Sequence, residues 1–130
     1  YRSSLVDETF FADTPAYMEW TYLAYKLCVS YEIGFVDNPG YIIHDTPGSL
    51  SKSLDYGRAY LAVLTRILEL PLPADAHRAL RGKYGAALHD LSASCLNQGE
   101  RWQAFIYHCR SLLQPEGLRF MLYGRRFLGF

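Results

Sequence analysis

The sequence predicts a mainly α-helical protein, in which a helical bundle follows a small α+β piece with a short β ribbon. Apolar residues recur at helical spacing in several segments, and proline or glycine ends most of these segments. The connection over 31–53 differs, because it contains two short β-prone runs. With 130 residues, half of them hydrophobic, the chain is long enough to form one modest core.

A first helix is predicted over about 15–30. Thr14 can cap this helix, and Pro15 suits its first position. The apolar positions that follow at helical spacing are Trp20, Leu23, Ala24, Leu27 and Cys28. The runs "IGFV" (33–36) and "YIIH" (41–44) are joined by "DNPG", which is strong turn chemistry. We therefore expect a short antiparallel ribbon after the helix.

Two further helices are predicted after this ribbon. Ser49 or Ser51 can cap the first, which must end before Pro71. Pro73 begins the second, and Gly99 supplies its left-handed end. Their predicted core positions are Leu54, Leu61, Leu64, Ile67 and Leu68, then Ala76, Leu80, Tyr84, Leu88, Leu91 and Cys95.

The last two helical segments complete the predicted bundle. One begins at Glu100 and is stopped by Pro115. Its predicted core positions are Trp102, Phe105, Ile106, Cys109, Leu112 and Leu113. The other is an amphipathic segment over 116–130, weakened by Gly117 and Gly124. Because the connections are short, we expect neighbouring helices to pack antiparallel.

Charge and composition exclude several classes of protein. Thirteen basic and thirteen acidic residues balance, which argues against nucleic-acid binding. No apolar run is long enough to span a bilayer. Cys28, Cys95 and Cys109 lie among apolar neighbours without metal-like spacing, so we interpret them as buried free thiols. Free thiols favour a reducing compartment and hence a cytoplasmic location.

Few residues are candidates for chemistry on pattern alone. Glu19 is the only carboxylate of the first helix, where it is either reactive or simply favoured by the helix dipole. His44 ends an apolar run as either a structural residue or a ligand. His77, His89 and His108 lie in predicted helices without zinc-site spacing, and we interpret them as structural. Nucleotide-binding glycine motifs and the GxSxG motif are absent from the sequence.

The order of motifs in the first 53 residues is distinctive. Glu19 and Trp20 form an acidic–aromatic pair, Lys26 follows in the same helix, and then come "IGFVDNP", "YIIH" and "PGSLSKS". The opening "YRSSL" precedes them. This order resembles the end of the catalytic domain of family-2 glycosyltransferases, which have the A-type nucleotide-sugar-binding fold. The resemblance divides the chain into the C-terminal end of a catalytic domain (1–53) and a helical extension (54–130).

The resemblance implies a reaction and residues for it. Such enzymes transfer a sugar from a nucleotide-sugar donor to an acceptor hydroxyl, with inversion, and use a divalent cation, Mg²⁺ or Mn²⁺. The family's general base is an aspartate, and its position falls on Glu19 or, by a one-residue choice of alignment, on Trp20. By resemblance Glu19 is the catalytic residue, His44 contacts the metal or the diphosphate, and Trp20, Ser49 and Ser51 bind substrate.

The resemblance also implies partners. They are the nucleotide-sugar donor, a saccharide or lipid-linked acceptor, and the rest of the catalytic domain, without which we expect the chain to be inactive. The aromatic and arginine-rich segment 116–130 suits either peripheral contact with the inner face of a membrane or ordinary core packing. The alternative to an enzyme is a non-catalytic helical module that binds another protein.

Overall fold

The computed structural model describes residues 6–15, 17–34, 40 and 54–127, and these residues are mainly helical, with no strand among them. The elements, where η marks a 3₁₀ helix, are η2 (Glu8–Phe11), α1 (Glu19–Ser30), α2 (Leu54–Leu68), α3 (Ala74–Asn97), α4 (Arg101–Leu112) and η4 (Gly117–Phe127). The predicted mainly helical fold is thereby confirmed. Most of the predicted ribbon, near 33–36 and 41–44, lies outside the described residues.

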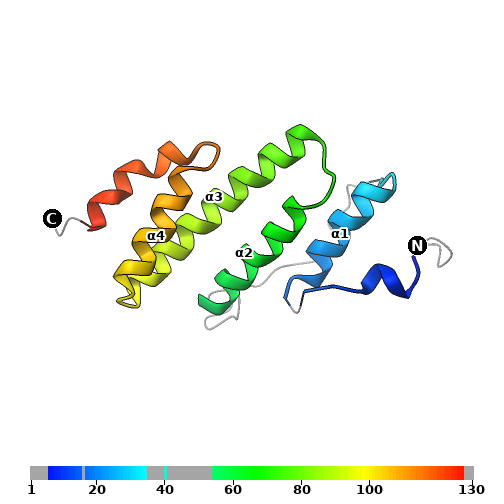
Figure 1. Cartoon of the computed structure of the whole chain (residues 1–130), viewed down its shortest axis with the longest axis horizontal. Coiled ribbons are helices and arrows are strands. Elements are labelled where there is room, and N and C mark those ends of the chain that lie inside the picture. Colours follow the sequence, from blue (N-terminus) through cyan, green and yellow to red (C-terminus); the bar gives the residue numbers. More distant parts are fainter. Residues whose placement is uncertain (1–5, 16, 35–39, 41–53, 128–130) are drawn as a thin grey trace.

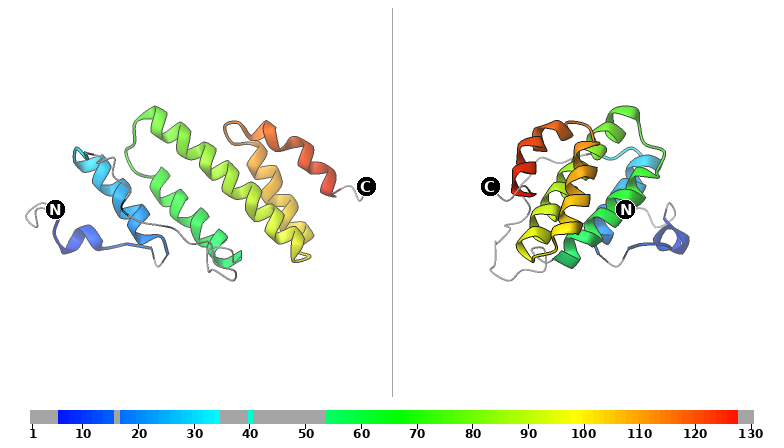
Figure 2. Two further views of the ribbon diagram at one scale, coloured as in Figure 1. Left: turned by 180° about the vertical axis from the view of Figure 1, so that it is seen from behind. Right: turned by 60° about the vertical axis from the view of Figure 1, so that its left-hand side comes forward.

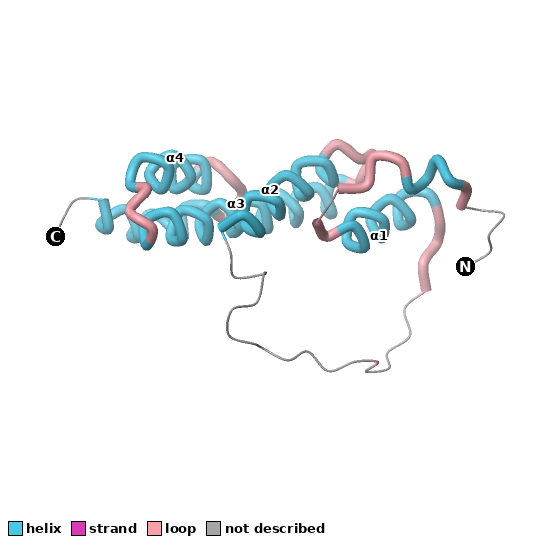
Figure 3. Tube along the Cα trace, turned by 90° about the horizontal axis from the view of Figure 1, so that it is seen from below, coloured by secondary structure: helices cyan, strands magenta, loops and turns pink. Residues whose placement is uncertain are grey.

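The helices lie side by side in the order of the chain (Figure 1). α1 packs on α2, α2 on α3 and α3 on α4, while η4 covers α4 and part of α3. α2, α3 and α4 alternate in direction, as their short connections predict (Figure 2). Seen from below, the array is elongated, with η2 and η4 at opposite ends (Figure 3). None of the described helices is long and apolar enough to cross a membrane.

The predicted start of the first helix is wrong. α1 begins at Glu19 rather than Pro15, directly after Met18 in the left-handed conformation (φ 58°). Thr14 does not cap α1, because its hydroxyl donates to the carbonyl of Phe11 at 2.6 Å. The threonine therefore closes the turn after η2, and α1 starts without a side-chain cap.

The core lies mainly between α2 and α3, as the apolar spacing predicts. Leu64, Ile67 and Leu88 are fully buried there. Burying one such side chain contributes about 1.5–3 kcal/mol to folding. Pro73 precedes the first residue of α3, and Gly99 follows its end with φ +83°. Both predicted ends of this helix are confirmed.

The predicted core face of α4 is wrong. Trp102 is 72% exposed and Phe105 is also exposed, although their spacing placed them inside. The buried face carries Ala104 and His108 instead. Ser92 of α3 donates its hydroxyl to the carbonyl of Ala104 at 2.7 Å. Small and polar side chains therefore bring the backbones of α3 and α4 together, and the larger apolar side chains of α4 face outward.

The three thiols do not share one environment. Cys95 is buried in the core, as predicted, and Cys109 is half-buried. Cys28 is exposed on α1, so the prediction of a buried thiol is wrong at this position. Burial raises the pKa of the Cys95 thiol, which therefore stays protonated and packs as a small apolar group.

Candidate functional site

Only two of the residues predicted to form a site are described. Glu19 is the first residue of α1 and is half-buried, and Trp20 beside it is 76% exposed. His44, Ser49 and Ser51 lie outside the described residues. A carboxylate in the first turn is favoured by the helix dipole. Glu19 is thus a half-buried carboxylate at the start of α1, and its catalytic role stays a prediction.

An apolar hollow of about 170 Å³ lies between η2 and α1, and one of the residues that line it, Trp20, directly follows Glu19. It is lined by Val6, Phe10, Phe11, Trp20, Leu23, Ala24 and Leu27. Because the lining contains no charged side chain, this hollow suits an apolar group and would not neutralise a phosphate. Trp20 adds an exposed indole to its edge.

Lys26 links α1 to η2, and Asp7 caps η2. The Lys26 ammonium donates to the carbonyl of Phe10 at 2.5 Å and lies 4.6 Å from the centre of the Phe10 ring. Asp7 caps η2, accepting hydrogen bonds from the Thr9 hydroxyl (2.5 Å) and the Phe10 amide (3.2 Å). These bonds, that from Thr9 above all, lower the pKa of Asp7. Lys26 is therefore a structural cation in the described part of the chain.

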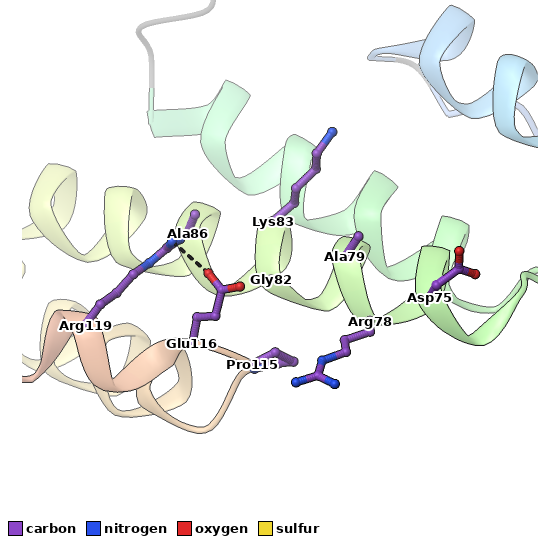
Figure 4. A pocket seen from close by; sticks show the side chains of 9 residues that line it. All are labelled: Asp75, Arg78, Ala79, Gly82, Lys83, Ala86, Pro115, Glu116 and Arg119. Atoms are coloured by element: carbon purple, nitrogen blue, oxygen red, sulfur yellow. Dashed lines mark hydrogen bonds and ion pairs between the residues drawn. The ribbon is translucent and has the colours of Figure 1, made fainter.

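A second, wider hollow of about 500 Å³ lies between α3 and the start of η4 (Figure 4). Its floor consists of small residues, Ala79, Gly82 and Ala86. Arg119 and Glu116 pair across its edge at 3.1 Å. Arg78 and Lys83 extend to different sides of α3 (Figure 4). Because the cations do not converge and acids lie among them, we do not assign an anion site here.

Two buried histidines organise the opposite end of the array from α1. His89 of α3 and His108 of α4 lie with ring centres 6.3 Å apart. Phe120 of η4 stacks on the His89 ring at 4.2 Å, and Tyr123 meets the same ring edge-on at 4.6 Å. The Arg126 guanidinium lies 3.4 Å from His89 Nε2. Phe120, Tyr123 and Arg126 are three residues apart, which is the period of a 3₁₀ helix. They therefore lie in one row of η4, and this row faces His89.

The surroundings of both histidines disfavour their charged form. Burial, followed by the nearby Arg126 guanidinium, lowers the pKa of His89 and of His108. The Nδ1 atom of each ring is buried and has no hydrogen-bond partner in the described part of the chain. Because these histidines lack zinc-site spacing, the sequence predicts structural residues here. The spacing of Phe120, Tyr123 and Arg126, three residues apart, was a signal in the sequence that these side chains share one face of a 3₁₀ helix.

The described residues do not fit a metal centre. No three histidine, cysteine, aspartate or glutamate side chains come together in that part of the chain. The Mg²⁺ or Mn²⁺ ion implied by the resemblance therefore lacks a complete ligand set there, and His44, its predicted ligand, lies outside the described residues. We derive no step of a reaction through this ion.

Comparison with known proteins adds no assignment. No protein-family model matches this sequence, and no curated protein or solved structure is significantly similar to it. The function is therefore argued from the residues themselves. The features of functional interest are Glu19, the apolar hollow beside α1, and the outward faces of α4 and η4.

Proposed function

We propose that this chain is the C-terminal part of a glycosyltransferase that moves a sugar from a nucleotide-sugar donor to an acceptor hydroxyl. The observation that supports this most is the apolar surface of η2 and α1, where the exposed side chains of Phe11 and Trp20 line the hollow. A helix that leaves so much apolar surface uncovered suits a further layer of protein. The rest of the catalytic domain is the partner that we propose for this surface.

In this proposal Glu19 is the general base. Its carboxylate takes the proton of the acceptor hydroxyl while that oxygen attacks the anomeric carbon, and the nucleoside diphosphate leaves from the opposite face with inversion. Trp20 offers its exposed indole to the acceptor sugar. Ser49 and Ser51 hydrogen-bond to substrate, and His44 faces the diphosphate. The proposed location is the cytoplasm, since the cysteines are interpreted as free thiols.

The test begins with the coding sequence upstream of Tyr1. A strand-rich region with a DxD motif is expected there, because a donor site needs ligands for the diphosphate and its metal. In the protein with that region, Glu19→Gln is expected to lower transfer by about a hundredfold to ten-thousandfold while nucleotide binding is kept. Glu8→Gln, a change in the first turn of η2, is the matched control and is expected to transfer sugar normally. Full activity of Glu19→Gln would contradict the assignment of the base.

A second candidate is a non-catalytic helical interaction module. The observation in its favour is that α2, α3 and α4 share a core, while α4 exposes Trp102 and Phe105, with ring centres 6.1 Å apart. Exposed aromatic residues are typical of protein interfaces. If this candidate is correct, Trp102→Ala is expected to weaken binding of the partner, and Glu19→Gln is expected to change nothing. The same two variants therefore separate the two candidates.

A further inference from the structure

η4 exposes side chains outward mainly in its first half and at Arg125, whereas Phe127 near its end packs on His108 and Phe105. In a 3₁₀ helix, residues three apart lie in one row. The row of Phe120, Tyr123 and Arg126 packs on His89. The neighbouring rows carry exposed leucine and methionine side chains: Leu118 (73% exposed), Met121 (59%) and Leu122 (68%). These three side chains form an apolar surface that no described part of the chain covers.

The charge of η4 differs from that of the rest of the chain. Residues 117–127 contain three arginines and no acid, which leaves ten basic against thirteen acidic residues elsewhere in the neutral chain. Arg119 pairs with Glu116 at 3.1 Å, and both side chains are exposed. Arg125 is exposed and has no hydrogen bond or ion pair with the described residues. The apolar surface therefore lies beside Arg125, which no acid in the described part of the chain neutralises, and beside Arg119, whose charge is shared with the exposed Glu116.

We propose that this outward face of η4, made of Leu118, Arg119, Met121, Leu122 and Arg125, binds the surface of a bilayer that contains anionic lipids. The apolar side chains enter the boundary between head groups and acyl chains, and the guanidinium groups pair with lipid phosphates. The proposal does not depend on the glycosyltransferase function.

The arrangement of charge and apolar groups favours a bilayer over a protein partner. Arg119, Leu122 and Arg125 share one row, so a cation, an apolar group and a second cation meet the partner at the same depth. An anionic bilayer offers phosphates directly above hydrocarbon everywhere on its surface. It therefore matches this row without any specific register, whereas a protein would need acids at two fixed positions.

The experiment is flotation of the 130-residue chain with vesicles of phosphatidylcholine containing about one third phosphatidylglycerol. Binding is expected to these vesicles, to weaken at high salt, and to be much weaker to pure phosphatidylcholine. Leu122→Ser is expected to weaken binding about tenfold or more. Arg125→Gln is expected to weaken it about fivefold, the effect of one basic side chain at an anionic surface.

Two controls change matched residues away from η4. Ile33→Ser removes an exposed apolar side chain after α1. Arg78→Gln removes an exposed cation of α3 that has no ion pair with the residues that the structure describes. Both are expected to bind as the unchanged chain does. The proposal is overturned if the chain binds neither kind of vesicle, or if the controls lose as much binding as the η4 variants. Self-association that Leu122→Ser abolishes, without vesicle binding, would mean that a second copy covers this face.

Discussion

The two sides of α3 are packed by different chemistry. Toward α2 the contacts are apolar and close: a Cβ added at Gly57 would lie 3.1 Å from Leu91 Cδ1. Toward α4 and η4 the contacts involve His89, Ser92 and Gly85, and the large apolar residues of α4 face outward. The first side resembles an ordinary core, and the second is a close fit of small and polar groups. Substitutions can measure how much each side contributes.

The largest loss of stability is expected from a substitution in the apolar contact between α3 and α2. Ile67 is fully buried between the helices, so Ile67→Ala is expected to lower the free energy of unfolding by about 2–5 kcal/mol. Chemical denaturation followed by circular dichroism measures this. Ile106→Ala is the control, because Ile106 is exposed on α4 and its loss is expected to cost less than about 0.5 kcal/mol. Equal losses would show that the core does not lie where the structure places it.

A smaller effect is expected at the turn between α4 and η4. A Cβ added at Gly117 would meet the carbonyl oxygen of Ser111 and lie 2.6 Å from that of Leu112. Backbone atoms cannot yield as side chains do, so Gly117→Ala is expected to displace η4 at a cost of about 1–3 kcal/mol. Hydrogen exchange is expected to rise in α4 and η4 and to stay unchanged in α2. Uniform loss of protection would contradict the separation of the two sides.

The same contrast explains what the sequence could predict. Leu64, Ile67 and Leu88 recur at helical spacing, and hydrophobic burial acts on that spacing directly, so α2 and α3 were predicted with their core. The face of α4 was predicted wrongly because Ala104 and His108 carry little hydrophobic signal. Their burial depends on η4 and on the close approach of the α3 and α4 backbones, which the periodicity of apolar residues does not encode. For the candidate site, the sequence correctly placed Glu19 in the first helix, whereas the assembly with His44 stays a prediction.

Acid is expected to lower the stability of the fold through His89 and His108, on the side of α3 that faces α4 and η4. Because the pKa values of His89 and His108 are lowered in the folded chain, the unfolded chain, with ordinary values near 6.5, holds more protons between the folded pKa and pH 6.5. Proton uptake therefore favours unfolding, and stability is expected to fall as pH drops below about 6.5. The ionisable groups that act on His89 are Asp90, His108, Arg119 and Arg126, and of these only Asp90 opposes the shift.

Denaturation between about pH 5 and 8 measures this effect. His108→Gln is expected to flatten the dependence on pH, because one of the two buried groups no longer titrates. His77→Gln is the matched control: His77 lies near the start of α3, only half-buried, and its loss is expected to leave the contact between His89 and His108 intact. If His77→Gln flattens the curve as much as His108→Gln does, the histidine pair is not the source of the acid sensitivity.

The smallest effect compares two glycines of α3 that lie three residues apart. A Cβ added at Gly82 would meet nothing within 4 Å, so Gly82→Ala keeps the full helical advantage of alanine, about 0.5–1 kcal/mol. A Cβ added at Gly85 would lie 2.7 Å from Gln114 Cβ. Gly85→Ala gains the same helical propensity, but the clash costs at least as much free energy as that gain. Thermal denaturation is therefore expected to show a higher midpoint for Gly82→Ala and an unchanged or lower one for Gly85→Ala. The difference between the two measures packing alone, since propensity cancels. Equal gains would mean that the side of α3 facing α4 and η4 is loosely packed, contrary to the buried contacts of Ser92 and His108.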